Sequence, residues 1–300
     1  MAGDTLRCAD SSEARAEPLY GTASIVRRWV LLEQPGSWGY DAPTRSRLPE
    51  RMATELRARA RSAGVRIILI RRGTRFAGSE RQVYFARTHE AGVNLSHATL
   101  GKVDDLLDFD LGALNDTRPP AGTTTKDEPI FLVCTHGRHD ACCSIRGNQV
   151  ARIACAADRV EAWECSHIGG DRFAANLVCF PHGIYYGRVT PQSVAGLMES
   201  YAERIISLEH YRGRSCYGFA VQAAEYFLRR ETNTLGVDDV SLFTRTLTRD
   251  ELIATFAIPG NRSAEVRLRI STGEEQHRLT CQSPVTYSIP RYELISCTLT

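Results

Sequence analysis

Lysine is almost absent from this chain of 300 residues, where only Lys102 and Lys126 are found among 37 basic side chains. Basic and acidic residues are nearly equal in number, 37 against 35, and no cluster of basic side chains stands out. That balance argues against a protein that binds nucleic acid. The chain also lacks the run of about 18 apolar residues that a membrane helix needs, and its N-terminus lacks the apolar segment of a secretion signal. We therefore expect a cytoplasmic protein that binds neither nucleic acid nor a membrane.

Several common catalytic motifs are missing as well. The sequence contains no Gly-x-Gly-x-x-Gly fingerprint and no P-loop, and His89-Glu90 is not followed by the second histidine of a zinc-protease helix. The pair Asp104-Asp105 falls on a segment expected to be an exposed helix, so it does not indicate the carboxylate pair of a glycosidase. No two cysteines have the Cys-x-x-Cys spacing of a thiol redox motif. With 43% hydrophobic and 24% charged residues, the composition is that of an ordinary folded protein.

Ten cysteines are the most unusual part of this composition. A cytoplasmic protein of this size keeps its thiols reduced, so we do not expect a disulfide scaffold. A free cysteine is most often a small core residue, and we assign that role to Cys155, Cys179, Cys216, Cys281 and Cys297. Cys8 stands alone near the N-terminus. The other four lie within about 30 residues of one another, among histidines and glycines: Cys134, Cys142, Cys143 and Cys165.

The first part of the chain has the pattern of a small α/β domain, residues 1–114, after a polar arm over the first 20 residues. Its hydrophobic runs and helical spacing predict a β-α-β-β order. The predicted elements are a strand at 27–33, a helix from Pro49 to Gly64, and strands at 65–71 and 81–87. Residues 115–129 are rich in proline and turn-forming residues, which is typical of an interdomain linker.

The second part, residues 130–231, has the element order of a thioredoxin-like domain, and a small α+β region is expected at 232–300. The apolar run IFLVC at 130–134 predicts a buried strand, and VEAWEC at 160–165 predicts another. The remaining predicted elements are a helix around 146–157, a hairpin over 176–189, helices that begin at Thr190 and cover 218–231, and a helix near 248–256. The predicted fold class is α/β.

Both strands of this second part end in a cysteine and lead into loops with potential metal ligands. Cys134 is separated from Cys143 by eight residues, and the loop after Cys165 contains His167 and Asp171. The carboxyl ends of strands are where open α/β folds bind their ligands. Two loops with these spacings suit a bimetallic cluster. Glycines between His167 and Asp171 let the backbone approach such a cluster and direct N–H groups at its sulfides.

Three motifs in this region resemble the sucrase/ferredoxin-like family, whose members contain a thioredoxin-like [2Fe-2S] ferredoxin domain. They are CTHGRHDACC at 134–143, WECSHIGGDRFAANLV at 163–178 and PHGIYYGRV at 181–189, and the N-terminal stretches EPLYGTA and LLEQPGSWG also fit. The resemblance implies that Cys134 and Cys143 bind one iron of a [2Fe-2S] cluster and that His167 binds the other. Family members have a second histidine where this chain has Asp171.

That departure leaves the fourth ligand open. Asp171 itself is one candidate, although a carboxylate is a harder and rarer cluster ligand than sulfur or imidazole. Cys142 and Cys165 are alternatives, since one is adjacent to a ligand and the other lies on the same strand face as His167. A further alternative is that Asp171 accepts a hydrogen bond from Arg172 or from a backbone N–H. Three neighbouring residues are expected to support the cluster from outside: Gly169, Gly170 and Arg172.

The expected function is one-electron transfer, by a carrier or sensor that works with a redox partner protein. Replacing thiolate by neutral imidazole makes a cluster less negative and raises its reduction potential, and an exposed imidazole can couple a proton to the electron. Two other functions fit the same residues. One is a thiol oxidoreductase that uses Cys134, Cys142 or Cys143, and the other is a structural zinc module. Three further histidines could tune the site: His136, His139 and His182.

Overall fold

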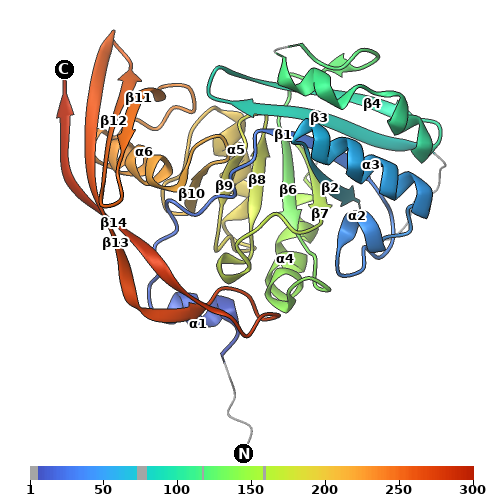
Figure 1. Ribbon diagram of the computed structural model, residues 1–300, viewed down its shortest axis with the longest axis horizontal. Helices are drawn as coiled ribbons and strands as arrows, with labels where there is room; N and C mark the ends of the chain where they lie inside the picture. The colour runs from blue at the N-terminus through green and yellow to red at the C-terminus, as the bar shows by residue number, and fades with distance from the viewer. Residues whose placement is uncertain (1–5, 73–79, 117, 158–159) are drawn as a thin grey trace, which may run out of the picture.

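The computed structural model describes residues 6–72, 80–116, 118–157 and 160–300, and its centre is a ten-stranded sheet (Figure 1). The strand order is β10-β9-β8-β6-β7-β2-β1-β3-β4-β5. The bounds of these strands are β1 (Arg28–Glu33), β2 (Arg66–Arg71), β3 (Arg81–His89), β4 (Gly92–Leu100), β5 (Thr124–Thr125), β6 (Ile130–Cys134), β7 (Glu161–Cys165), β8 (Leu177–Phe180), β9 (Ile184–Tyr186) and β10 (Tyr211–Arg214).

Helices lie against this sheet and the loops at its edges (Figure 1). They are α1 (Cys8–Ala14), α2 (Ala42–Arg45), α3 (Glu50–Ala63), α4 (Ala141–Ala154), α5 (Val194–Ala202) and α6 (Phe219–Thr232), with three short 3₁₀ helices, η1 (Val103–Asp108), η2 (Leu111–Asn115) and η3 (Asp171–Phe173). The predicted α/β fold class is therefore confirmed. The parallel pair β6 and β7, the connecting helix α4, the hairpin β8–β9 and the following α5 have the element order predicted for the thioredoxin-like domain.

The two predicted α/β regions share one sheet. β2 pairs with β7, with Ile70 opposite Cys165 and Arg71 opposite Glu164. The segment 115–129, expected to be a linker, contains β5, which pairs with β4. Hydrogen bonds between paired strands satisfy the backbone polar groups that the sheet buries. The two regions are therefore joined by strand pairing and not only by a flexible connection.

The C-terminal residues form a second sheet that is entirely antiparallel, in the order β11 (Ser241–Leu247), β12 (Glu251–Ile258), β13 (Arg262–Arg278) and β14 (Thr286–Leu299). The predicted helix near 248–256 is wrong, because this stretch is a turn followed by β12. Burial alternates along β12, where Leu252, Ala254 and Phe256 face the core, and a period of two is the signature of a strand. α6 packs on this sheet through a common hydrophobic core.

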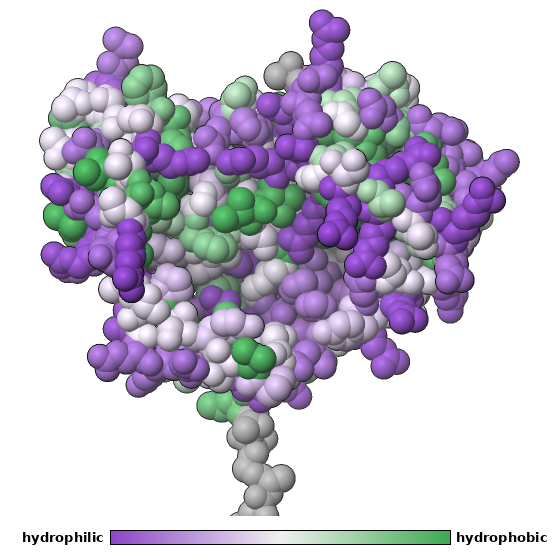
Figure 2. All heavy atoms as spheres, in the orientation of Figure 1, coloured by the Kyte–Doolittle hydropathy of each residue, from purple (hydrophilic) through white to green (hydrophobic). Residues whose placement is uncertain are grey.

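The long strands β13 and β14 extend beyond their sheet toward the N-terminal helix α1 (Figure 1). Their pairing shifts register between Thr272 and Gln276, and beyond that point the hairpin continues with Arg278 opposite Thr286. The face of the molecule shown in Figure 2 is mainly hydrophilic, with hydrophobic residues gathered near its middle. Among the described residues, no helix is long and apolar enough to span a membrane.

Candidate metal centre

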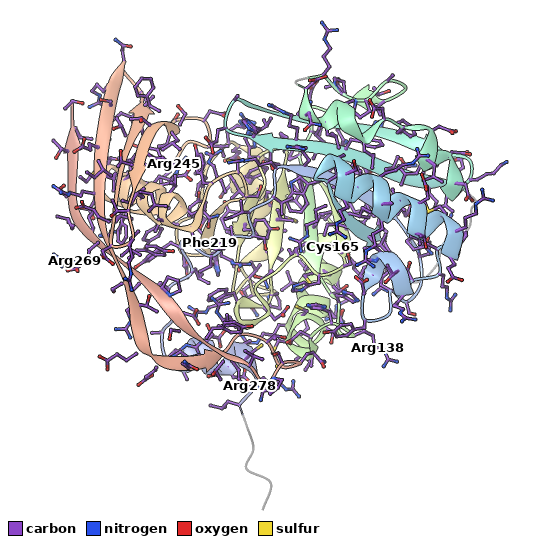
Figure 3. All side chains as sticks on the ribbon, viewed as in Figure 1. Arg138, Cys165, Phe219, Arg245, Arg269 and Arg278 are labelled. Atoms are coloured by element: carbon purple, nitrogen blue, oxygen red, sulfur yellow. The ribbon has the colours of Figure 1, made fainter. Side chains whose placement is uncertain are left out.

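Three of the predicted ligands converge at one edge of the central sheet. Cys134 is the last residue of β6, Cys143 lies in the first turn of α4, and His167 follows the end of β7. One ligand atom from each of these side chains lies within 4.8 Å of the other two. Strands β6 and β7 are parallel, with Cys134 opposite Cys165, so the loops that follow them leave the sheet at the same edge. Figure 3 labels Cys165 at the end of β7 and Arg138 in the loop after β6.

Asp171, which stands where the resemblance implies a second histidine, contacts two members of this group. Its Oδ1 lies 3.0 Å from Nδ1 of His167 and accepts a hydrogen bond of 3.1 Å from Sγ of Cys143. Nδ1 of His167 is nevertheless a buried polar atom without an aligned hydrogen-bond partner. A buried ring nitrogen beside two sulfur atoms and a carboxylate is a set of donors that suits a metal or an iron–sulfur cluster.

The pKa values at the site are strongly shifted. Hydrogen bonds from Cys143 and Cys165 hold the pKa of the Cys134 thiol well below its usual range, although burial acts the other way. Burial alone would lower the pKa of His167, but the Asp171 carboxylate and the Cys134 sulfur outweigh it and raise that pKa to about 9. Burial alone would raise the pKa of Asp171, and the neighbouring His167 lowers it. Negative charge is therefore stabilised on a thiol and on a carboxylate, which are the charged donors that a metal needs.

The two alternative ligands lie in different surroundings. Cys165 is completely buried and hydrogen-bonded to Cys134, but its sulfur does not belong to the group within 4.8 Å. Cys142 points elsewhere, since its Sγ lies 3.6 Å from Sγ of Cys8 and 3.6 Å from Sγ of Cys281. Both Cys142 and Cys143 stand in the first turn of α4, which begins five residues earlier than the helix predicted around 146–157. Asp140, which no sequence motif singled out, caps this helix by accepting a 2.8 Å hydrogen bond from the N–H of Cys142.

The loop from His167 to Gly170 is fixed by hydrogen bonds to its carbonyl groups. Nη2 of Arg66 donates to the carbonyl of His167 at 2.9 Å, and Oγ of Ser24 donates to that of Ile168 at 2.8 Å. Nη1 of Arg212 donates to the carbonyl of Gly169 at 3.0 Å, and Nδ2 of Asn176 donates to that of Gly170 at 2.8 Å. Residues from four separate segments thus set the direction of this loop. Arg212 was not predicted, because it lies far along the chain in β10 and belongs to no motif.

The glycines of this loop are needed for its shape. Gly169 and Gly170 have φ values of +101° and +83°, which L-residues rarely adopt. A Cβ atom on Gly169 would meet Oγ of Ser24 at 2.2 Å, and one on Gly170 would meet Nη2 of Arg212 at 2.3 Å. Arg172 does not pair with Asp171. Its Nε donates to Glu17 at 2.7 Å, so it anchors the N-terminal arm beside the site.

Two of the three additional histidines contact the site. Nδ1 of His136 accepts a 3.2 Å hydrogen bond from the backbone N–H of His167. His139 stacks on the His167 ring, with the ring centroids 3.7 Å apart and an interplanar angle of 26°. The side chain of His167 is 22% exposed. The ring of Tyr40, a residue that is 59% exposed, lies next to that of His139 in a tilted arrangement, with the ring centroids 5.5 Å apart. His182 instead lies in the β8–β9 turn, where its Nδ1 is hydrogen-bonded to the hydroxyl of Tyr201.

The chain matches the model of the family described as sucrase/ferredoxin-like over residues 19–213, and it therefore belongs to that family. It is also 30% identical over 97 residues to a protein named altered inheritance of mitochondria protein 32 from Meyerozyma guilliermondii, covering 29% of this chain and 34% of that protein. The protein of the same name from Debaryomyces hansenii is 35% identical over 99 residues, covering 28% and 35%. The match thus spans about a third of the length of these relatives.

The chain is similar to solved structures of the thioredoxin-like [2Fe-2S] ferredoxin from Aquifex aeolicus. The wild-type crystal structure is 16% identical and covers 26% of this chain and 88% of the ferredoxin, with a TM-score of 0.23. A cysteine-to-serine variant of the same ferredoxin is 17% identical and covers 24% and 85%, with a TM-score of 0.22.

Proposed function

We propose that this protein is a one-electron carrier or sensor that holds a [2Fe-2S] cluster on Cys134, Cys143, His167 and Asp171. One observation carries the proposal. The donor atoms of Cys134, Cys143 and His167 lie within 4.8 Å of one another at the edge of the sheet, and the Asp171 carboxylate contacts both Cys143 and His167. Membership of a family described as ferredoxin-like supports it. A bound [2Fe-2S] cluster supplies reversible one-electron chemistry.

The residues around the donors are suited to bind such a group and to exclude water from it. Cys134 and Cys143 are buried, so their sulfur atoms are shielded from solvent. The backbone of His167 is held from both sides, by His136 at its N–H and by Arg66 at its carbonyl. Ligands fixed in this way need little rearrangement when an electron arrives or leaves, and their hydrogen bonds influence the reduction potential.

The exposed side of the site indicates where a redox partner protein would dock. His167 is the one proposed ligand that reaches the surface. His139 stacks on its ring, and the exposed Tyr40 lies next to His139. Electrons exchanged with a partner would pass through this edge. An imidazole in this position can also gain or lose a proton when the charge of the cluster changes.

The competing thiol mechanism is disfavoured by burial. A catalytic thiolate must be reached by its substrate, yet Cys134, Cys142 and Cys143 are all buried. A mononuclear zinc ion is the stronger rival, because Cys134, Cys143, His167 and Asp171 are acceptable zinc ligands. Zinc has no redox chemistry and no colour, so a spectrum separates the two.

The test is anaerobic purification of the full chain, followed by visible and EPR spectra and assays for iron, acid-labile sulfide and zinc. A brown protein with iron and sulfide in equal amounts is expected. His167→Ala should remove or change the spectra, whereas Cys216→Ser, a buried cysteine of the α6 core, should leave them unchanged. A colourless wild-type chain that cannot be reconstituted with iron and sulfide would overturn the proposal.

A further inference from the structure

A second group of potential ligands joins the two ends of the chain. Cys8 begins α1, Cys142 lies in the first turn of α4, and Cys281 lies in the turn between β13 and β14. Their sulfur atoms form a nearly regular triangle, with Sγ separations of 3.6 Å from Cys8 to Cys142, 3.6 Å from Cys142 to Cys281 and 3.4 Å from Cys281 to Cys8. All ten cysteines of the chain are free thiols in the structure.

Asp140 completes this group. Its Oδ2 lies 3.7 Å from Sγ of Cys8, and one ligand atom from each of the four residues lies within 4.8 Å of the others. The carboxylate is held in place by the N–H of Cys142 at 2.8 Å, the N–H of Cys281 at 2.6 Å and the hydroxyl of Thr280 at 2.8 Å. A carboxylate with such supporting hydrogen bonds is typical of a metal ligand with a fixed direction.

The triangle of sulfur atoms has the dimensions of one face of a zinc tetrahedron. With a Zn–S distance of about 2.3 Å, tetrahedral geometry places thiolate sulfurs about 3.8 Å apart. The observed separations of 3.4–3.6 Å need only a small expansion to reach that value. Three soft sulfur donors and one oxygen donor suit zinc better than a hard cation such as magnesium or calcium.

We propose that Cys8, Cys142, Cys281 and Asp140 bind a zinc ion that fastens both ends of the chain to the start of α4. On binding, the three thiols release their protons to solvent and the carboxylate binds as the anion, so no oxidation or reduction is involved. The zinc is structural, since four protein ligands leave no position open for substrate. The site is separate from the candidate metal centre, which uses Cys143 and not Cys142.

The surroundings explain why a metal would be needed there. The apolar contacts at this point come from a small cluster of Cys8, Ala9, Cys142 and Ala174, against which Cys281 packs. So few apolar groups bury little hydrophobic surface and contribute little stability. Metal–ligand bonds between Cys8 and Cys281, which are 273 positions apart, would supply the stability that hydrophobic contacts do not provide here. Arg278, beside α1 in Figure 3, donates a 2.8 Å hydrogen bond to the carbonyl of Cys281.

The experiment measures zinc and iron in the full chain, purified anaerobically, by mass spectrometry of the elements. Wild type should contain one zinc per chain in addition to any iron. Cys8→Ser and Cys281→Ser should each lose that zinc and keep the iron content and visible spectrum of wild type. Cys297→Ser is the matched control, because this half-buried cysteine lies in β14 of the same hairpin and away from the group. Cys143→Ser should keep its zinc.

A measurement on wild type alone covers the case in which these variants fail to fold. Cys8, Cys142 and Cys281 should resist alkylation by iodoacetamide until a chelator removes the metal, and they should then react. The proposal is overturned if wild type lacks zinc and takes up neither Zn²⁺ nor Co²⁺, or if Cys8 and Cys281 are found joined as a disulfide. Zinc that persists in Cys281→Ser but is lost in Cys143→Ser overturns it as well, and would place zinc at the candidate metal centre. Loss of the proposed [2Fe-2S] cluster alone leaves this inference intact.

Discussion

Cys142 and Cys143 are consecutive residues, yet their sulfur atoms belong to different groups of potential metal ligands. Sγ of Cys143 lies 3.1 Å from Oδ1 of Asp171, whereas Sγ of Cys142 lies 3.6 Å from Sγ of Cys8. Consecutive residues of an α-helix point about 100° apart, since one turn contains about 3.6 residues. The first turn of α4, capped by Asp140, therefore contributes one sulfur atom to each of the two groups of potential ligands.

The adjacent thiols should respond differently to the same substitution. Cys143→Ser is expected to abolish or shift the visible and EPR signals of an iron–sulfur cluster, because it removes one of its two proposed sulfur ligands. Cys142→Ser should leave these signals in place and reduce the zinc content. Spectra and metal analysis of both variants, prepared side by side, check this. The opposite pattern would exchange the roles of the two residues.

Replacing Asp171 by histidine should supply the ligand type that the family resemblance implies at this position. A neutral imidazole in place of a carboxylate makes the cluster less negative, so Asp171→His is expected to raise the reduction potential by on the order of 100 mV. The potential should also become more dependent on pH, because a second imidazole can titrate. Redox titrations of both proteins at several pH values measure this. An unchanged potential, in a variant that retains its cluster, would remove Asp171 from the ligand set.

Arg212 is expected to act as a positioning residue for the loop of Gly169 and Gly170. Its guanidinium donates to the carbonyl of Gly169 at 3.0 Å and to Oδ1 of Asn176 at 2.8 Å, and Nε donates to Oγ1 of Thr22 at 3.1 Å. The single ammonium of Arg212→Lys cannot serve these acceptors together, and each buried acceptor left unpaired costs about 1–3 kcal/mol. We expect lower stability and faster loss of the cluster in air. The control is Arg230→Lys, because Arg230 forms an exposed ion pair with Glu231. This variant should match wild type in stability and in the rate of cluster loss.

The local part of the site could be read from the sequence. IFLVC and VEAWEC are apolar runs between turn-forming residues, and such runs indicate buried strands without knowledge of the rest of the fold. Since the two strands are parallel neighbours, their terminal residues Cys134 and Cys165 lie side by side. The approach of His167 and Asp171 to Cys143 follows from this arrangement.

Contacts between segments far apart in the chain could not be predicted from local sequence patterns. Cys281 was interpreted as a core residue and Cys8 as an isolated thiol, because nothing in their neighbourhoods shows that residues 273 positions apart meet. The pairing of β2 with β7, which merges the two α/β regions into one sheet, is another long-range contact. The mistaken helix near 248–256 has a different cause, since the alternation of Leu252, Ala254 and Phe256 was present and was read with the wrong period.

Glu225 is expected to be essential for the stability of the α6 region. Its buried carboxylate accepts hydrogen bonds from Nε of Arg214 at 2.8 Å, Nη2 of Arg229 at 2.9 Å and the hydroxyl of Tyr211 at 2.7 Å. Glu225→Ala leaves two buried guanidinium groups without their counter-charge, which typically costs about 3–5 kcal/mol. Urea unfolding should show that loss. Glu293→Ala, which breaks an exposed pair with Arg269, should hardly change the midpoint.

His182 should make the fold sensitive to mild acid. Burial, and then the positive charges of Arg214 and Arg204, lower its pKa to about 3, although Asp238 acts in the opposite direction. The neutral ring is hydrogen-bonded to the hydroxyl of Tyr201. In the unfolded chain the pKa of histidine is about 6.5, so below that pH the unfolded state binds a proton that the folded state does not.

His182 therefore makes its full contribution to the free energy of unfolding above about pH 6.5, and that contribution is lost as the pH falls toward about 3. The free energy of unfolding decreases by up to about 1.4 kcal/mol for each pH unit in this range. His182→Asn keeps a polar side chain near Tyr201 but cannot titrate. The free energy of unfolding of both proteins is measured in urea at about pH 7 and about pH 5. The carboxylates affect both proteins equally, so their effect cancels in the comparison. The stability of wild type should fall more steeply than that of the variant. Equal slopes would mean that the His182 pKa is not lowered in the folded protein.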